Sequence, residues 1–221
     1  MKSNLTEIVF ILDRSGSMSG IESDTIGGYN SFLETQRKVE GEAHVMTVLF
    51  DNRYEILHNG LDIKNVKPIT NKEYYARSST ALLDAIGKTI MDVGQRLSDT
   101  VESERPSKVV FVITTDGYEN SSIEFSYEKI KGMIVEQQEK YSWEFIFLGA
   151  NIDAAKEAKN LGIRASRAAN YAANAHGTGD MYNVMASSVA SYRKTGEIKE
   201  NWSDRINKDN SKKKNNVHRA H

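Results

Sequence analysis

Three short polar motifs, widely separated along the chain, contain oxygen donors that suit a metal ion. They are D-R-S-G-S at residues 13–17, S-S-T at residues 78–80 and T-D-G at residues 115–117. Their carboxylates and hydroxyls are hard oxygen ligands, which suit Mg²⁺, Mn²⁺ or Ca²⁺ and not zinc. With only two carboxylates, Asp13 and Asp116, such a site leaves coordination positions for water or for an oxygen of a partner.

Each motif also has a simpler interpretation when it is taken alone. Asp13 or one of the serines after it can cap a helix in an ordinary strand-to-helix turn. Thr80 can cap the helix predicted after it, and either serine before it can exchange roles with it. Asp116 can begin a turn with the glycine that follows. The coincidence of three such motifs favours a metal site over three separate turns.

The first and third motifs each lie at the end of a run of apolar residues. Residues 8–12 and 109–115 are almost continuously apolar, which is typical of strands buried on both faces of a parallel sheet. Residues 45–50 and 143–150 predict two more strands. The Y-E-I-L run at residues 54–57 follows the second strand after only D-N-R. So short a link predicts a hairpin and therefore one antiparallel edge strand.

Between these runs, apolar residues recur at helical spacing. The pattern predicts helices at residues 26–37, 81–98, 127–138, 154–161 and 179–194. Strands that alternate with helices indicate an α/β fold: a doubly wound, Rossmann-like, mostly parallel central sheet with helices on both faces. Ligands of such sheets bind beyond the carboxyl ends of the strands, where these motifs are expected to lie.

The motifs resemble those of the von Willebrand factor A (vWA) domain. D-R-S-G-S after a strand, a threonine before a helix and T-D-G after a later strand match that family's D-x-S-x-S motif, threonine and second aspartate in order. The resemblance covers roughly residues 5–194. It implies the vWA fold and a metal-ion-dependent adhesion site (MIDAS) made of Asp13, Ser15, Ser17, Thr80 and Asp116. In the family, the serines and often the threonine contact the ion, and the aspartates usually act through water.

Other stretches resemble small stand-alone bacterial or phage members, namely I-G-G-Y-N-S-F-L-E-T-Q-R-K, S-S-T-A-L-L-D-A-I-G and F-I-F-L-G-A-N-I-D-A-A-K. The family often has glycine shortly before the threonine, and this chain has Ser78 and Ser79 there, which leaves the geometry of that loop open. The resemblance implies a protein partner whose Asp or Glu completes the metal shell, and prokaryotic relatives often work with AAA+ ATPases. Mg²⁺ is the expected ion, with Mn²⁺ or Ca²⁺ as alternatives.

The composition is typical of a soluble globular protein. The chain has 221 residues, a net charge of −1 and no cysteine, which excludes disulfides and thiolate metal sites. No signal peptide or membrane-length apolar stretch is recognised, so a cytoplasmic location without a membrane partner is expected. Residues 1–200 are predicted to form the domain and residues 201–221 a basic, disordered tail. The lysines at 212–214 are interpreted as solubilising, so no nucleic acid is expected.

These features favour a divalent-metal-dependent protein-binding module, an adaptor or scaffold, over an enzyme. An aspartyl phosphotransferase generally needs a second aspartate two residues after the first, and Ser15 stands there. A serine hydrolase needs G-x-S-x-G, whereas residues 16–20 read G-S-M-S-G. No P-loop or dinucleotide fingerprint is present. A metal-dependent enzyme of the phosphotransferase or hydrolase type and a metal-independent vWA scaffold are the alternatives. The oligomeric state is left open.

Overall fold

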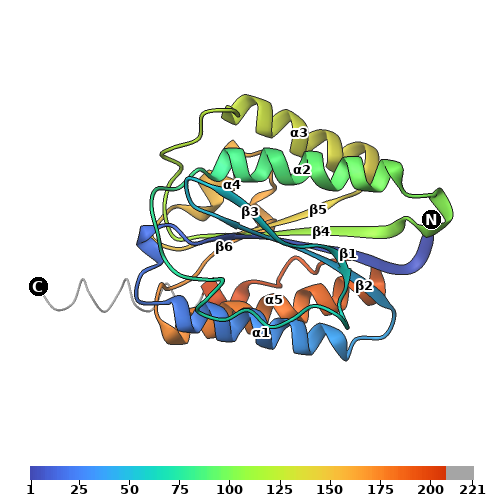
Figure 1. The fold of residues 1–221 in the computed structure, drawn as a ribbon, viewed down its shortest axis with the longest axis horizontal. Coiled ribbons are helices and arrows are strands. Elements are labelled where there is room, and N and C mark those ends of the chain that lie inside the picture. Colours follow the sequence, from blue (N-terminus) through green and yellow to red (C-terminus); the bar gives the residue numbers. More distant parts are fainter. Residues whose placement is uncertain (208–221) are drawn as a thin grey trace, which may run out of the picture.

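The central sheet of this protein has the strand order β3-β2-β1-β4-β5-β6 in a computed structural model that describes residues 1–207 (Figure 1). Neighbouring strands run parallel except β2 and β3, which are antiparallel. The strands are β1 (Lys2–Asp13), β2 (Glu42–Phe50), β3 (Tyr54–Asp62), β4 (Pro106–Thr115), β5 (Glu144–Gly149) and β6 (Ala168–Asn170). The predicted mostly parallel α/β sheet with one antiparallel edge strand is therefore confirmed.

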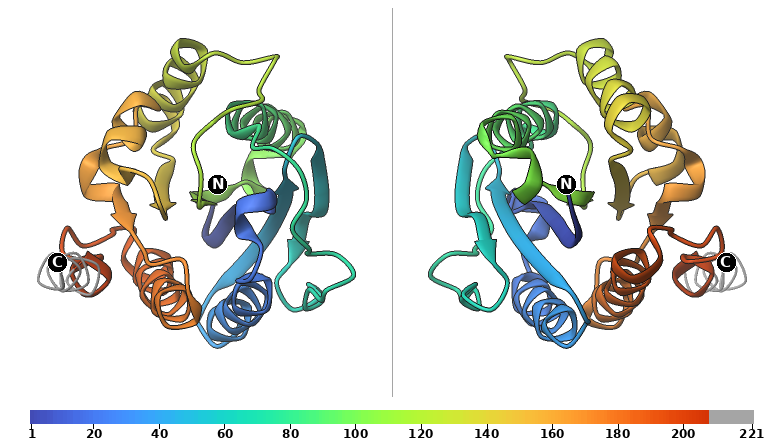
Figure 2. Two further views of the ribbon diagram at one scale, coloured as in Figure 1. Left: turned by 90° about the vertical axis from the view of Figure 1, so that its left-hand side faces the viewer. Right: turned by 90° about the vertical axis from the view of Figure 1, so that its right-hand side faces the viewer.

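Helices cover both faces of the sheet. The helices that cover the sheet are α1 (Glu22–Arg37), α2 (Leu82–Asp99), α3 (Tyr127–Tyr141), α4 (Ala154–Asn160) and α5 (Ala175–Thr195). Figures 1 and 2 show α1 beside α5 on one face and α2, α3 and α4 on the other, as a doubly wound fold requires. Over residues 1–207, no helix combines the length and apolar character needed to cross a membrane.

The apolar run of β1 is explained by its position in the middle of the sheet. Ile8, Phe10 and Leu12 belong to the hydrophobic cluster on the α1 and α5 face, whereas Val9 and Ile11 belong to the cluster on the opposite face. Side chains of a strand alternate between its two faces, so a strand covered on both sides is apolar at every position. The run ends at Asp13, the last residue of β1, at the carboxyl ends of the parallel strands, where the candidate site lies.

Several elements are longer than predicted, among them β1, β3, α1 and α5, and one strand, β6, has no predicted counterpart. β6 is only three residues long, with the sequence A-A-N, and pairs with β5 alone. So short a run has no recognisable apolar pattern, and it was not predicted. α5 begins at Ala175 and not at residue 179, because the Asn174 side chain accepts a hydrogen bond from the Gly177 N–H and caps the helix.

The packed domain continues beyond residue 200, so the predicted start of the tail at residue 201 is wrong. Trp202 and Ile206 are buried in the cluster on the α1 and α5 face. The Trp202 Nε1–H donates a hydrogen bond to the Ser166 carbonyl at 2.7 Å. Arg205 forms an ion pair with Asp180 at 2.6 Å. Burial of two apolar side chains, a hydrogen bond and an ion pair thus join this segment to the domain. The rest of the predicted tail, residues 208–221, lies outside the described residues.

Candidate metal centre

The first motif begins at the end of β1, where Asp13 is completely buried. Its Oδ1 accepts a hydrogen bond from the Ser15 backbone N–H at 2.6 Å, and its Oδ2 accepts one from the Thr115 hydroxyl at 2.6 Å. Thr115 is the last residue of β4, so this second bond joins the ends of two neighbouring strands. Helix α1 begins only at Glu22 and has no side-chain cap. The motif therefore does not serve as a helix cap.

The two serines connect this motif with the third one. The hydroxyls of Ser15 and Ser17 lie 3.1 Å apart, and the Ser17 hydroxyl donates to Asp116 Oδ1. The second oxygen of that carboxylate, Oδ2, is buried and has no hydrogen-bond partner among the described residues. A buried carboxylate oxygen without a partner is costly unless something else binds it.

Thr80 is held beside the same cluster. A Cβ atom built on Gly117 would lie 3.4 Å from Ser17 Oγ and 3.8 Å from Thr80 Oγ1, which places both hydroxyls next to the Asp116 turn. Helix α2 begins at Leu82, and its N-cap residue is Ala81, which makes no side-chain capping hydrogen bond. Thr80 is therefore not the helix cap that its position also allowed, and its buried hydroxyl faces the candidate site.

The loop before Thr80 packs directly on the first motif, with serines where the vWA pattern often has glycine. The Gly16 N–H donates a hydrogen bond to the Ser78 carbonyl at 2.7 Å. A Cβ atom at Gly16 would lie 2.8 Å from the Arg77 carbonyl oxygen, closer than such atoms approach. Close backbone contact explains why this position is a glycine. The structure thus gathers all of the predicted ligands into one cluster: Asp13, Ser15, Ser17, Thr80 and Asp116.

The electrostatics of the cluster are those of buried charge without a basic partner. Burial raises the pKa of Asp13 to about 6, although hydrogen bonds from Thr115 and Ser15 oppose this shift, and the nearby Asp116 adds to it. Burial also raises the pKa of Asp116, against the hydrogen bond from Ser17. Both carboxylates are thus destabilised in their charged form, which a cation would reverse.

Basic residues elsewhere in the fold do not neutralise the carboxylates of Asp13 and Asp116. The Arg14 guanidinium, which belongs to the first motif, contacts Glu55 at 2.5 Å and the Glu73 carbonyl at 3.2 Å. Three other buried acids each have an arginine partner: Glu7 with Arg96, Asp51 with Arg77 and Asp180 with Arg205. Within residues 1–207, Asp84 and Glu157 are buried without an ion pair as well, but they accept hydrogen bonds from backbone N–H groups and from the Tyr127 hydroxyl, respectively. The Asp13 and Asp116 pair differs from all of these because two buried carboxylates lie together and one oxygen, Asp116 Oδ2, has neither a hydrogen bond nor an ion pair among the described residues.

The donor set fits a hard divalent cation. Residues 1–207 contain no group of three or more His, Asp or Glu side chains that could hold a metal by themselves. An ion bound here would therefore use hydroxyl oxygens together with the two carboxylates, one of which has a buried oxygen without a partner. Few ligand charges and open positions suit Mg²⁺, which keeps waters and takes oxygens from its partner.

Three residues near the site were not recognised as part of it. Asn120, Glu119 and Asp84 link the loop after Asp116 to the start of α2 through hydrogen bonds to backbone groups. Glu119 and Asn120 have the appearance of loop residues in the sequence, and Asp84 that of an acid favoured by the helix dipole. Their partners are about 40 residues away in sequence, so no local pattern could reveal the contacts.

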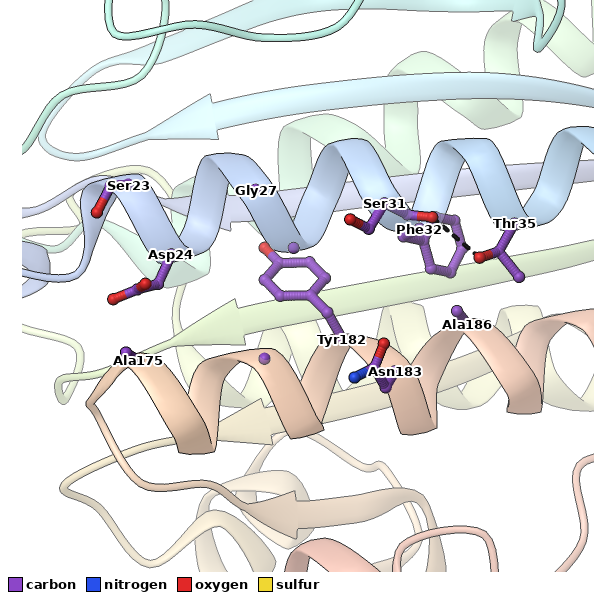
Figure 3. Close-up of a pocket in the computed structure, with 12 residues that line it drawn as sticks. Ser23, Asp24, Gly27, Ser31, Phe32, Thr35, Ala175, Tyr182, Asn183 and Ala186 are labelled. Atoms are coloured by element: carbon purple, nitrogen blue, oxygen red, sulfur yellow. Dashed lines mark hydrogen bonds between the residues drawn. The ribbon is translucent and has the colours of Figure 1, made fainter.

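Several hollows lie outside the ligand cluster. One, of about 740 Å³, is formed by Tyr118 and by the loops at residues 151–153 and 170–174, at the ends of β5 and β6. Another, of about 290 Å³, lies between α1 and α5 (Figure 3). There Tyr182 packs on Gly28, where a Cβ atom would lie only 2.1 Å from the Tyr182 ring. Neither hollow is lined by a candidate ligand.

Comparison with known proteins shows the fold of this chain. No protein-family model and no curated protein matches the sequence. Solved structures share its fold. Proximal thread matrix protein 1 (PTMP1) from the mussel byssus, in a structure with a zinc-occupied MIDAS motif, is 14% identical with a TM-score of 0.60. The matched region covers 85% of this chain and 46% of that one.

Two microbial structures are similar to the same degree. A von Willebrand factor type A protein from Catenulispora acidiphila is 14% identical with a TM-score of 0.59, over 85% of this chain and 43% of that one. The ArnB paralog VWA2 from Sulfolobus acidocaldarius is 17% identical with a TM-score of 0.53, over 84% and 45%. This chain thus spans less than half the length of these structures, and it has the fold of the vWA domain.

Proposed function

We propose that this chain is a divalent-metal-dependent protein-binding module, which acts as an adaptor or scaffold and not as an enzyme. The ion is held by Asp13, Ser15, Ser17, Thr80 and Asp116. An Asp or Glu of a protein partner completes its coordination shell. The observation that carries this proposal is the pair of buried carboxylates, which has hydroxyl and N–H donors and a buried oxygen without a partner, but no basic residue.

A bound cation would supply positive charge to the two carboxylates and an open position for the partner's oxygen. The chain's own residues orient that position: Thr115 and the Ser15 N–H hold the Asp13 carboxylate, and Ser17 holds Asp116. PTMP1 has zinc in its MIDAS motif. The oxygen donors of this chain favour Mg²⁺, with Mn²⁺ or Ca²⁺ as alternatives.

The partner is a protein with an exposed acidic side chain, and an AAA+ ATPase system is one candidate. The site offers a cation to a carboxylate, which is a chemistry that an acidic side chain satisfies. Neither nucleic acid nor a membrane is part of the proposal. A prokaryotic or phage origin and a cytoplasmic location, both expected from the sequence, stay predictions.

Calorimetric titration of Mg²⁺ and Mn²⁺ into metal-free protein tests the site. We expect saturable binding to the wild type and its loss in D13N and D116N, because each variant removes one of the two negative charges at the site. D153N is the matched control, since Asp153 is an exposed carboxylate whose capping role asparagine also fills. Circular dichroism checks that each variant is folded. A wild type that does not bind either metal at millimolar concentration contradicts the proposal.

The partner's role is tested with a small carboxylate in place of its side chain. If acetate completes the coordination shell, its presence must raise the affinity for Mn²⁺, and Mn²⁺ must raise the affinity for acetate, because linkage is reciprocal. Chloride at the same ionic strength is the control for screening. Equal Mn²⁺ affinity in both salts would show that the metal has no position open to a carboxylate.

A further inference from the structure

The loop that follows Asp116 is joined to the Thr80 segment by a reciprocal pair of hydrogen bonds. Asn120 Oδ1 accepts a hydrogen bond from the Thr80 N–H at 2.9 Å, and the Asn120 N–H donates one to the Thr80 carbonyl at 3.0 Å. Both polar groups of the Thr80 backbone are thus engaged by one residue. That residue lies only four positions after Asp116, the other side of the candidate metal centre.

The same loop also caps helix α2. Glu119 Oε2 accepts a hydrogen bond from the Leu83 N–H at 2.9 Å, in the first turn of that helix. Its other oxygen, Oε1, accepts hydrogen bonds from the N–H groups of Ser121 at 2.8 Å and Ser122 at 2.7 Å. The first turn of a helix has free N–H groups and a positive partial charge, so a carboxylate there is well placed.

Helix α2 in turn fastens the far end of the loop. Asp84 accepts hydrogen bonds from the N–H groups of Ile123 at 3.0 Å, Glu124 at 3.0 Å and Phe125 at 2.9 Å. The Asp84 N–H donates to the Ser122 hydroxyl at 3.0 Å. Each element therefore satisfies backbone donors of the other. The loop at residues 117–125 and the start of α2 form one hydrogen-bonded unit.

This unit determines where the Thr80 hydroxyl lies relative to Asp116. Both the Ser17 and Thr80 hydroxyls are next to Gly117, inside the same turn. The Asn120 side chain is the contact that reaches the Thr80 N–H, and the residue itself is exposed and not part of the hydrophobic core. Its amide therefore acts on the Thr80 backbone and not through general packing.

We propose that Asn120 is a positioning residue of the metal centre, which acts by holding Thr80 in place for the ion. The inference rests on the proposed function, because it assigns a purpose to Asn120 only if Thr80 is a ligand. A hydroxyl is a neutral ligand, and its contribution depends on being held in place before the ion arrives. Residues that orient metal ligands typically change metal affinity by about 10- to 100-fold when they are replaced.

A double-mutant cycle read by Mn²⁺ calorimetry tests this role. The variants are N120A, T80V and the double variant, with wild type as reference. We expect N120A to weaken Mn²⁺ binding by about tenfold in the wild-type background. In the T80V background the same change should weaken it less than twofold, because the group that Asn120 positions is already gone. Equal losses in both backgrounds would overturn the proposal, since Asn120 would then act independently of Thr80.

Two further variants separate positioning from general damage to the loop. N120D keeps the oxygen that accepts from the Thr80 N–H, so it should restore most of the affinity that N120A loses. N52A is the matched control, because Asn52 is exposed in another loop and makes no side-chain hydrogen bond among those described. Failure of N120D to bind better than N120A would contradict the proposal. Urea unfolding of each variant shows whether stability has changed.

A metal-free measurement keeps this inference distinct from the proposed function. In protein treated with chelator, amide hydrogen exchange of the Thr80 N–H should be faster in N120A than in wild type, because its acceptor is gone. Unchanged exchange would contradict the positioning role directly. A wild type that binds no Mn²⁺ would instead contradict the metal site itself, whatever the exchange data show, and the role for Asn120 would fall with it.

Discussion

Strand β1 carries two completely buried carboxylates, Glu7 near its middle and Asp13 at its end, and their surroundings differ. The Glu7 carboxylate receives both terminal nitrogens of Arg96, at 2.6 Å and 3.3 Å. Asp13 receives a hydroxyl and an N–H, and its neighbouring charge is the carboxylate of Asp116.

The difference separates a structural charge from a candidate functional one. At Glu7 the fold supplies the opposite charge itself, so the pair is complete within the chain. At Asp13 the fold supplies only neutral donors, which orient the carboxylate without neutralising it. Two neighbouring buried carboxylates without an opposite charge, one of them with an oxygen that has no hydrogen-bond partner among the described residues, are a reason to expect a positive charge from outside, which here is a divalent cation.

The largest expected loss of stability is at the ion pair of Glu7 and Arg96. R96M removes the positive charge and leaves Glu7 buried without it, so the free energy of unfolding should fall by about 3 to 5 kcal/mol. Urea unfolding at neutral pH measures this loss. R53M is the matched control, because Arg53 is exposed, and its replacement should change stability by less than about 0.5 kcal/mol.

Removal of both charges sharpens the same comparison. The double variant E7Q with R96M no longer buries an unpaired charge and should recover more than half of the stability that R96M loses. If R96M alone leaves stability unchanged, Glu7 does not depend on Arg96, and the contrast with Asp13 disappears.

The second effect is a pH dependence of stability that arises from Asp13, which lies next to Asp116 without a basic partner. The pKa of Asp13 is about 6 in the folded protein and 3.8 ordinarily, so between these values the folded state holds a proton that the unfolded chain has released. Stability of the metal-free protein is therefore highest below about pH 4 for this group and falls as the pH rises through 6. The total loss should be about 3 kcal/mol.

Urea unfolding in the presence of chelator, between pH 4 and 7, measures this slope. The comparison is with D13N, which has no proton to release at this position and should show a shallower decline over the same range. Mg²⁺ should raise the stability of the wild type at pH 7 and leave D13N unchanged. A pH profile that is the same for both proteins would show that burial of the Asp13 charge has no energetic consequence.

The fold could be predicted from the sequence wherever a segment has a recognisable pattern of apolar residues of its own. Residues 8–12 and 109–115 are apolar at nearly every position because β1 and β4 are buried between two helical layers, and both strands were recognised for that reason. β6 could not be recognised, since its short A-A-N sequence becomes a strand only by pairing with β5. The burial of Trp202 and Ile206 is not predictable in this way, because isolated apolar residues show no period.

At the candidate site, too, residues with a recognisable local motif could be predicted and the others could not. The resemblance of three local motifs to those of the vWA domain implies the residues proposed as ligands, and the structure brings them together. Whether they bind metal stays a prediction. Asn120 could not be found in this way: its role depends on the backbone of Thr80, which is 40 residues away in sequence. Residues that orient ligands need no fixed spacing, only proximity in the folded chain.

The smallest expected effect concerns the main-chain carbonyl of Asp13 at the end of β1, as distinct from the Asp13 carboxylate. The buried Tyr74 hydroxyl donates a hydrogen bond to the Asp13 main-chain carbonyl at 2.5 Å, not to its side chain. Y74F should therefore lower the free energy of unfolding by about 1 kcal/mol and change Mn²⁺ affinity by less than about threefold. Y141F, at an exposed tyrosine, is the control and should change neither quantity. If Y74F abolished Mn²⁺ binding with its stability intact, the position of the strand end, and not the missing positive charge, would be what distinguishes Asp13 from Glu7.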